Sequence, residues 1–201
     1  LVGLCDARPE ALQQALQGGV EAALHFSDAR AMLEARKPDC VVVSTTCPSH
    51  AALTCLAAES GASHVLCEKP MASSLAECDR MLDACARSGA KLAINHQMRF
   101  MEQYTRVREI VRSEEFGGLA SVTVVAGNFG IAMNGSHYFE MFRYLTDEPA
   151  AEAAAWFSPN RVANPRGPEF EDRAGSVRLE TASGRHFYLE VGEDQGHGVR
   201  V

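Results

Sequence analysis

Hydrophobic residues in the first half of the chain gather in short runs, and amphipathic stretches separate these runs. The apolar runs lie at residues 2–5, 40–45, 64–67 and 92–95. An apolar run without alternation is typical of a parallel strand that is buried on both faces. Helical character falls between the runs, at residues 11–17, 28–36, 51–59 and 75–88. The predicted order is therefore β-α-α-β-α-β-α-β, which favours a doubly wound parallel sheet.

Capping signals support these helices. Asp28 offers an N-cap for the second helix, and Ser74-Leu75-Ala76-Glu77 has the capping-box pattern. Behind that box, four residues form an apolar stripe at helical spacing: Leu75, Cys78, Leu82 and Cys85. Gly89 then predicts the end of the helix.

The pattern changes after residues 95–101. Tyr104, Val107, Ile110 and Val111 indicate an amphipathic helix, and a strand is expected over 119–126. A helical stretch at 137–145 is followed by three strand patterns, at 153–157, 177–181 and 187–191. The last two flank Ser183-Gly184, which predicts a hairpin, and Trp156 is expected to pack in this second sheet. We therefore predict two domains, 1–98 with the parallel sheet and 99–201 with an α/β fold and a mostly antiparallel sheet.

Composition narrows the possible partners. The formal net charge is -7 and no basic block interrupts the sequence, which argues against nucleic acid or an anionic membrane surface as a partner. No stretch is long and apolar enough to span a bilayer. Seven cysteines without a Cys-x-x-Cys pair favour buried free thiols in a reducing cytoplasm over disulfides or a metal site. We therefore expect a cytoplasmic protein.

Three candidate sites lie at the carboxyl ends of predicted strands, where doubly wound sheets bind ligands. Asp6 ends the first strand and could accept hydrogen bonds from ribose hydroxyls, although taken alone it would be interpreted as a plain cap of the following helix. A carboxylate there favours NAD over NADP, while the neighbouring Arg8 leaves NADP possible. The turn from Ser44 to His50 has small polar residues that would let a cofactor approach the backbone, but it could also be an ordinary strand-to-helix turn.

The third candidate is Cys67-Glu68-Lys69-Pro70, directly after an apolar strand. An ammonium group beside a reacting hydroxyl or carbonyl could stabilise negative charge during hydride transfer, or assist proton transfer if its pKa is lowered. The alternative is a solvated Glu-Lys pair on a loop, which is the commoner fate of such pairs.

Taken together, these motifs resemble the Gfo/Idh/MocA oxidoreductases, the glucose–fructose oxidoreductase and inositol dehydrogenase group. Three later segments extend the resemblance over nearly the whole chain: residues 95–100 (Asn-His-Gln-Met-Arg-Phe), 117–122 (Gly-Gly-Leu-Ala-Ser-Val) and 134–140 (Asn-Gly-Ser-His-Tyr-Phe-Glu). The family implies an N-terminal NAD(P)-binding Rossmann domain and a C-terminal domain that covers the active site and makes oligomer contacts.

The resemblance also implies roles for individual residues. Lys69 and His137 would be catalytic, with His137 exchanging a proton with the substrate hydroxyl, and Asn134 would join them in binding substrate. The expected cofactor-binding residues are Asp6, Thr45, Thr46, Pro48, His50, Glu68 and Lys69. Without the resemblance, His137 would be interpreted as a histidine at a helix start, and Arg99 is expected to be architectural.

The sequence departs from the family in three places. Met133 stands where many members carry Asp, four residues before the histidine, and Glu140 replaces the usual Asp three residues after it. No Gly-x-Gly-x-x-Gly fingerprint precedes Asp6, although it normally lies roughly 20 residues earlier. We therefore expect a chain that begins after the first Rossmann strand and ends before the last strands of the second domain. We also expect these 201 residues alone to fold poorly and to bind dinucleotide weakly.

The function expected from the resemblance is hydride transfer between NAD, or NADP, and a secondary alcohol of a sugar, cyclitol or related polyol. A homo-oligomer is also expected. Two alternatives stay open within the family: a glycoside hydrolase that retains its NAD, and a sensor that binds dinucleotide without turnover.

Overall fold

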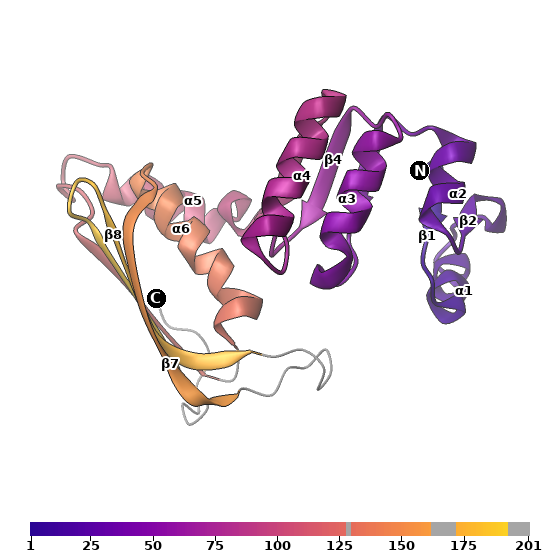
Figure 1. The fold of residues 1–201 in the computed structure, drawn as a ribbon. Coiled ribbons are helices and arrows are strands. Elements are labelled where there is room, and N and C mark those ends of the chain that lie inside the picture. Colours follow the sequence, from indigo (N-terminus) through magenta and orange to yellow (C-terminus); the bar gives the residue numbers. More distant parts are fainter. Residues whose placement is uncertain (128–129, 162–171, 193–201) are drawn as a thin grey trace. The chain divides into compact units, whose positions relative to one another are not determined.

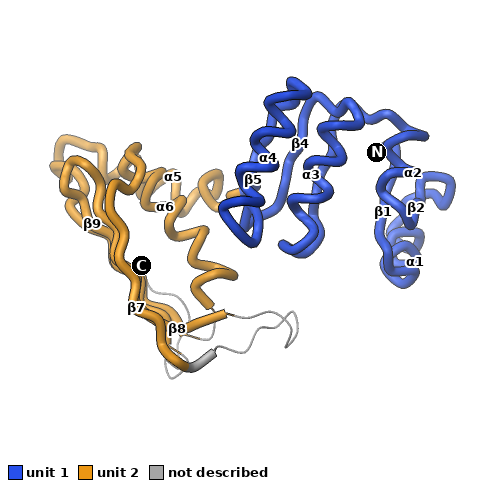
Figure 2. Tube along the Cα trace, in the orientation of Figure 1, with its two compact units in different colours: residues 1–95 blue, residues 96–201 orange. Residues whose placement is uncertain are grey.

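A computed structural model describes residues 1–127, 130–161 and 172–192 and divides the chain into two compact units (Figure 2). Unit 1 is Leu1–Asn95 and unit 2 is His96–Val201. The division falls three residues before the boundary expected from the sequence. None of the helices in the described ranges is long and apolar enough to cross a membrane.

Unit 1 alternates strands with helices along the chain (Figure 1). Its elements are β1 (Leu4–Cys5), α1 (Pro9–Gln17), η1 (Ala22–Leu24), β2 (His25–Phe26), α2 (Ala29–Arg36), β3 (Cys40–Val43), η2 (Cys47–Ser49), α3 (His50–Glu59), β4 (His64–Glu68), α4 (Leu75–Ser88) and β5 (Lys91–Asn95). The sequence interpretation missed β2, which has only two residues and no apolar run. With β2 included, a helix follows each of the first four strands.

The strands of unit 1 pair in parallel, as predicted. β1 pairs with β2, and β4 lies between β3 and β5 in a separate three-stranded sheet. Helices α3 and α4 lie side by side against the three-stranded sheet (Figure 1). A core of small and medium side chains fills the space between them: Val43, Ala51, Ala57, Ala62, Val65, Cys67 and Met81.

Two predictions about burial in unit 1 are wrong. Val42 in β3 is 61% exposed, so this strand is not buried on both faces. Among the described residues, β3 is an edge strand, and only alternate side chains such as Val43 face the core. In α4, Leu75 and Leu82 of the predicted stripe are exposed, whereas Cys85 of the same stripe is buried together with Met81 and Ala84, on the side where α4 packs against α3.

The cysteines are all free thiols, as expected, but only Cys67 and Cys85 are buried. Cys40 is exposed because it points to the uncovered face of β3, and the other four are half-buried. The prediction that the thiols are buried therefore holds for two of the seven.

The described part of unit 2 combines four helical elements and a four-stranded sheet. Its elements are η3 (Gln97–Phe100), α5 (Glu102–Val111), β6 (Ser121–Gly127), η4 (Ile131–Gly135), α6 (Ser136–Thr146), β7 (Ala150–Arg161), β8 (Arg173–Thr181) and β9 (His186–Gly192). The sheet order is β6-β9-β8-β7, in which β6 and β9 are parallel and the other two pairs antiparallel. This arrangement confirms the predicted fold class. The β8–β9 hairpin is also confirmed, and Gly184 adopts the positive φ of 82° that its turn requires.

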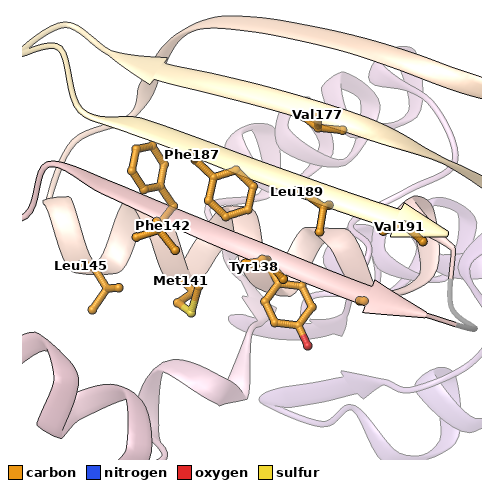
Figure 3. Packing of buried hydrophobic residues seen from close by; sticks show 11 residues of the cluster. Tyr138, Met141, Phe142, Leu145, Val177, Phe187, Leu189 and Val191 are labelled. Atoms are coloured by element: carbon orange, nitrogen blue, oxygen red, sulfur yellow. The ribbon is translucent and has the colours of Figure 1, made fainter. Parts of the chain in front are cut away.

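The core of unit 2 lies between α6 and the sheet (Figure 3). Phe142 of α6 packs on Phe187 of β9 with ring centroids 5.4 Å apart. Around them gather apolar residues from α6 and from three strands: Val122, Val124, Ala126, Tyr138, Met141, Leu145, Val177, Leu189 and Val191. Trp156 does not join this core, contrary to expectation, because it lies on the edge strand β7 and is 65% exposed. In α5, Val107 and Ile110 of the predicted stripe are exposed too, whereas Val111 is buried.

Candidate active site

The carboxyl edge of the three-stranded sheet gathers polar residues from three strands. Strand register places Val43, Cys67 and Ile94 side by side. The residues that follow them, Ser44, Glu68 and Asn95, therefore lie along the same edge. This is the edge at which doubly wound sheets bind their ligands.

The turn after β3 is stabilised by its own hydroxyl groups. The side-chain oxygens of Thr45 and Ser49 lie 2.6 Å apart, and Ser49 Oγ donates to the Thr46 carbonyl oxygen at 2.9 Å. Pro48 lies in the short helical turn η2, as its fixed φ favours. Thr45, Thr46 and Pro48 are exposed, so the backbone and hydroxyls of this turn are accessible to a ligand.

His50 lies behind this turn and joins it to the next loop. Its side chain is 1% exposed, with Nδ1 2.8 Å from the Pro70 carbonyl oxygen and Nε2 3.1 Å from the Thr45 carbonyl oxygen. A neutral imidazole donates from one nitrogen only, so the ring bonds one carbonyl or the other unless it is protonated. This placement gives His50 the role of linking two loops, and any effect on a cofactor would be indirect.

Strand β4 ends at Glu68 and is followed directly by Lys69, and the Lys69–Pro70 peptide bond is cis. Glu68 accepts hydrogen bonds from Asn95 Nδ2 at 2.6 Å and from the Lys69 amide at 3.3 Å. Both Glu68 and Lys69 are half-buried, so the pair is not a fully solvated loop feature. The sequence interpretation missed Asn95, whose contact with Glu68 arises from the register of β4 and β5.

Asp6 follows β1, and its carboxylate is engaged by Arg8. The Arg8 amide and Nε donate to Oδ1 at 2.9 and 3.1 Å, and Nη2 donates to Oδ2 at 3.0 Å. These hydrogen bonds hold the pKa of Asp6 below its ordinary value. Asp6 does not occupy the N-cap position of α1, which belongs to Arg8, so the interpretation of Asp6 as a plain cap is not supported.

His137 is the second residue of α6 and is 4% exposed. Its ring meets the ring of His96 edge-on, with centroids 5.8 Å apart. The helical backbone begins six residues earlier, at Ile131 in η4, and this segment also contains Asn134. Gly135 occupies the N-cap position of α6, so His137 lies in the first turn of α6 and does not cap it.

The residue that caps this helical segment is Asp172, which the sequence interpretation did not single out. Its carboxylate accepts hydrogen bonds from the amides of Ala132 and Met133 at 2.9 and 2.8 Å. Asp172 lies directly before β8, some 40 residues further along the chain. No local capping pattern could have pointed to it.

Arg99 is held by α6. Its Nη1 lies 2.9 Å from Glu140 Oε1, and its guanidinium lies 5.0 Å from the centre of the Tyr144 ring. Arg143 approaches the other oxygen of Glu140 at 3.4 Å. These contacts fit the architectural role expected for Arg99, because they tie η3 to α6.

The candidate residues thus form groups within each unit. Unit 1 holds Lys69 together with Thr45 and Glu68 at the carboxyl edge of its three-stranded sheet. Unit 2 holds Asn134 and His137 on one helical segment. Among the described residues, no cluster of His, Cys, Asp or Glu is arranged to hold a metal ion.

Comparison with known proteins agrees with this geometry. Residues 1–96 match the family model described as "Oxidoreductase family, NAD-binding Rossmann fold". A D-apiose dehydrogenase from Paraburkholderia graminis is 33% identical over 172 residues, which cover 77% of this chain and 45% of that protein. An inositol 2-dehydrogenase from Saccharopolyspora erythraea is 29% identical over 194 residues, covering 90% of this chain and 56% of the relative.

Solved structures show the same fold. The aldose-aldose oxidoreductase from Caulobacter crescentus, crystallised with glycerol, matches with a TM-score of 0.80 and 27% identity, and the match covers 96% of this chain and 63% of that structure. The chain spans about half the length of the curated relatives it matches. The family model, the two dehydrogenases and this shared fold agree with one another, and residues 1–96 belong to the Gfo/Idh/MocA family of oxidoreductases.

Proposed function

We propose that this protein transfers a hydride between a nicotinamide dinucleotide and a secondary alcohol of a sugar, cyclitol or related polyol. The observation that carries the proposal is the strand register that brings Thr45, Glu68 and Lys69 to one edge of a parallel sheet. Relatives named for activity on D-apiose and inositol support the class of substrate.

The residues of unit 1 fit a dinucleotide. The exposed turn at Thr45, Thr46 and Pro48 offers hydroxyls and an accessible backbone, and Asp6 offers a carboxylate for ribose hydroxyls. The bound cofactor would supply the hydride chemistry, which no side chain can supply. NAD is the preferred form because Asp6 repels a 2′-phosphate, but Arg8 pairs with that carboxylate and keeps NADP possible.

The proton is handled by the side chains of the chain itself. In this proposal Lys69 orients the reacting oxygen and stabilises the negative charge that develops on it. His137 exchanges the hydroxyl proton, since an imidazole titrates near neutral pH and can act in both directions. Asn134, in the same helical segment, donates or accepts a hydrogen bond to the substrate.

The test compares Lys69→Ala and His137→Ala with matched controls in the full-length protein. Lys91 and His64 are exposed residues at the starts of β5 and β4, so Lys91→Ala and His64→Ala are suitable controls. With NAD or NADP and a panel of polyols and sugars, absorbance of the reduced nicotinamide measures turnover. We expect kcat to fall about 10²- to 10⁴-fold in each test variant, with the controls unchanged.

Turnover that survives in both test variants would refute these roles. A wild-type protein that binds dinucleotide tightly without any turnover would instead favour the sensor. Met133, at the position where many relatives carry Asp, is the residue that makes this second outcome worth testing. Retained NAD combined with glycoside hydrolysis would instead indicate the NAD-retaining glycoside hydrolase.

A further inference from the structure

The helical segment that carries Asn134 and His137 begins against a buried carboxylate. Asp172 is 5% exposed, and its two oxygens accept the amides of Ala132 and Met133. The Arg173 amide also donates to Oδ1, at 2.9 Å. The first amides of a helix have no partner within the helix, so an ionised acceptor there satisfies them and favours the helix dipole.

Gly130 allows this close contact because it has no side chain. A Cβ built on Gly130 would overlap the Asp172 carboxylate, and its three nearest atoms all belong to that side chain. The backbone of Gly130 has φ -87° and ψ 160°, which any residue adopts. Glycine is therefore needed at this position for space, because the carboxylate must lie directly against the backbone.

A second contact fixes the other end of the segment. A Cβ on Gly135 would lie 3.3 Å from Ile131 Cγ2, 3.4 Å from Phe139 Cζ and 3.5 Å from Leu189 Cδ2. The backbone at Gly135 thus packs closely on its own helix and on β9. Asp172 holds one end of the segment from Ile131 to Gly135, and this packing holds the other end. The segment that leads into His137 therefore has little room to shift.

We propose that Asp172 is a positioning residue that sets the orientation of the segment 131–137, and with it the placement of Asn134 and His137. The proposal rests on the proposed function, in which those two side chains contact substrate. Charge-assisted hydrogen bonds to two successive amides resist both rotation and sliding of the helix start. The carboxylate comes from the strand side of unit 2, so Asp172 fixes the helix start relative to the sheet on which α6 packs.

The main variant is Asp172→Asn in the full-length protein. Asparagine keeps the size of the side chain but offers one acceptor oxygen, so it can no longer serve both amides with separate oxygens. Since misplacement of a reacting group by about 1 Å can lower the rate by about 10²-fold, we expect kcat to fall about 10- to 100-fold. Dinucleotide affinity, which depends on unit 1 in our proposal, should be unchanged.

Glu148→Gln is the matched control. Glu148 follows the opposite end of α6 and also accepts a backbone amide, from Ser183 at 3.4 Å, with the Ser183 hydroxyl at 2.9 Å. Its loss should leave kcat within about twofold of wild type. If Asp172 contributed only to stability, Asp172→Asn and Glu148→Gln could both lower the melting temperature, but they would have the same kcat. Equal kcat values in the two variants would therefore contradict the positioning role.

A second readout does not depend on turnover. The imidazole carbon signals of His137, observed by NMR with selectively ¹³C-labelled histidine and assigned with His137→Gln, report the surroundings of that ring directly. They should move in Asp172→Asn and stay in place in Glu148→Gln. If the wild-type protein shows no turnover on any substrate, the proposed function fails, whereas this signal still decides whether Asp172 positions His137.

Gly130→Ala tests the same contact from the opposite side and serves if Asp172→Asn does not fold. The three atoms nearest to the added methyl all belong to Asp172, so its effect on kcat should largely disappear in the background of Asp172→Ala. Additive effects of these two substitutions would overturn the proposal. So would a folded Asp172→Asn protein with wild-type kcat and unshifted His137 signals.

Discussion

The buried imidazole of His50 provides a direct test of how unit 1 holds its two cofactor loops. The substitution His50→Ala removes the partner that lies 2.8 Å from the Pro70 carbonyl oxygen and 3.1 Å from the Thr45 carbonyl oxygen. A buried acceptor left unsatisfied costs about 1–3 kcal/mol. A neutral ring serves one of the two carbonyls, and its removal also leaves a cavity, so we expect a loss of about 2–4 kcal/mol in the free energy of unfolding.

Urea denaturation followed by far-UV circular dichroism measures this loss. With an m-value of about 2 kcal/mol/M, the midpoint should fall by about 1–2 M. His64→Ala is the control, since this exposed histidine at the start of β4 should change stability by less than about 0.5 kcal/mol. Dinucleotide affinity should also weaken in His50→Ala, because both loops lose their link. If the two variants had the same midpoint, His50 would not be the linking residue that its geometry indicates.

Two further predictions concern titrating groups. Hydrogen bonds from Arg8 lower the pKa of Asp6 below its ordinary value, so the pairing stabilises the fold above that ordinary pKa and its contribution is lost as the pH falls through the lowered one. In Arg8→Ala the backbone amide of residue 8 still donates to Asp6 but the guanidinium is gone, so the NMR titration midpoint of Asp6 should rise, and an unchanged midpoint would contradict the pairing. Burial raises the pKa of the Cys67 thiol from 9.0 to about 11, so about 100-fold less thiolate is present at pH 8. Iodoacetamide should therefore modify the exposed Cys40 well before Cys67 in the native protein, as peptide mapping can check, and equal rates would refute this reasoning.

Features of the fold that depend on neighbours in sequence could be predicted from the chain alone. The Asp28 cap forms as expected, with Oδ1 accepting the Ala31 amide at 2.8 Å. At α4, Ser74 Oγ accepts the Glu77 amide, and Glu77 accepts the amide of Ser73, one residue earlier than the capping box requires. Such contacts span four residues or fewer, so the residue types and their spacing determine them.

Which face of an element is buried could not be predicted in the same way. Leu75 and Leu82 have helical spacing, yet they are exposed, and Met81 and Cys85 are buried on the side of α4 that packs against α3. Alternation in β3 is hidden because Cys40, Val41, Val42 and Val43 are all apolar, and only the sheet order shows which of them face the core. Burial depends on both of the elements that pack together, whereas the hydrophobic pattern of a helix or strand describes only that element.

The start of the helical segment before His137 shows how this limit reaches the candidate site. The family resemblance predicts an acidic residue four positions before the histidine, and Met133 stands there instead. The structure brings a carboxylate to the Met133 amide from Asp172, a residue 39 positions away. Both oxygens of Asp172 accept backbone amides, so this carboxylate orders the helix start. The motif Asn134-Gly135-Ser136-His137 therefore owes its conformation partly to a strand-side residue, and the prediction that His137 exchanges a proton depends on a contact that lies outside the motif.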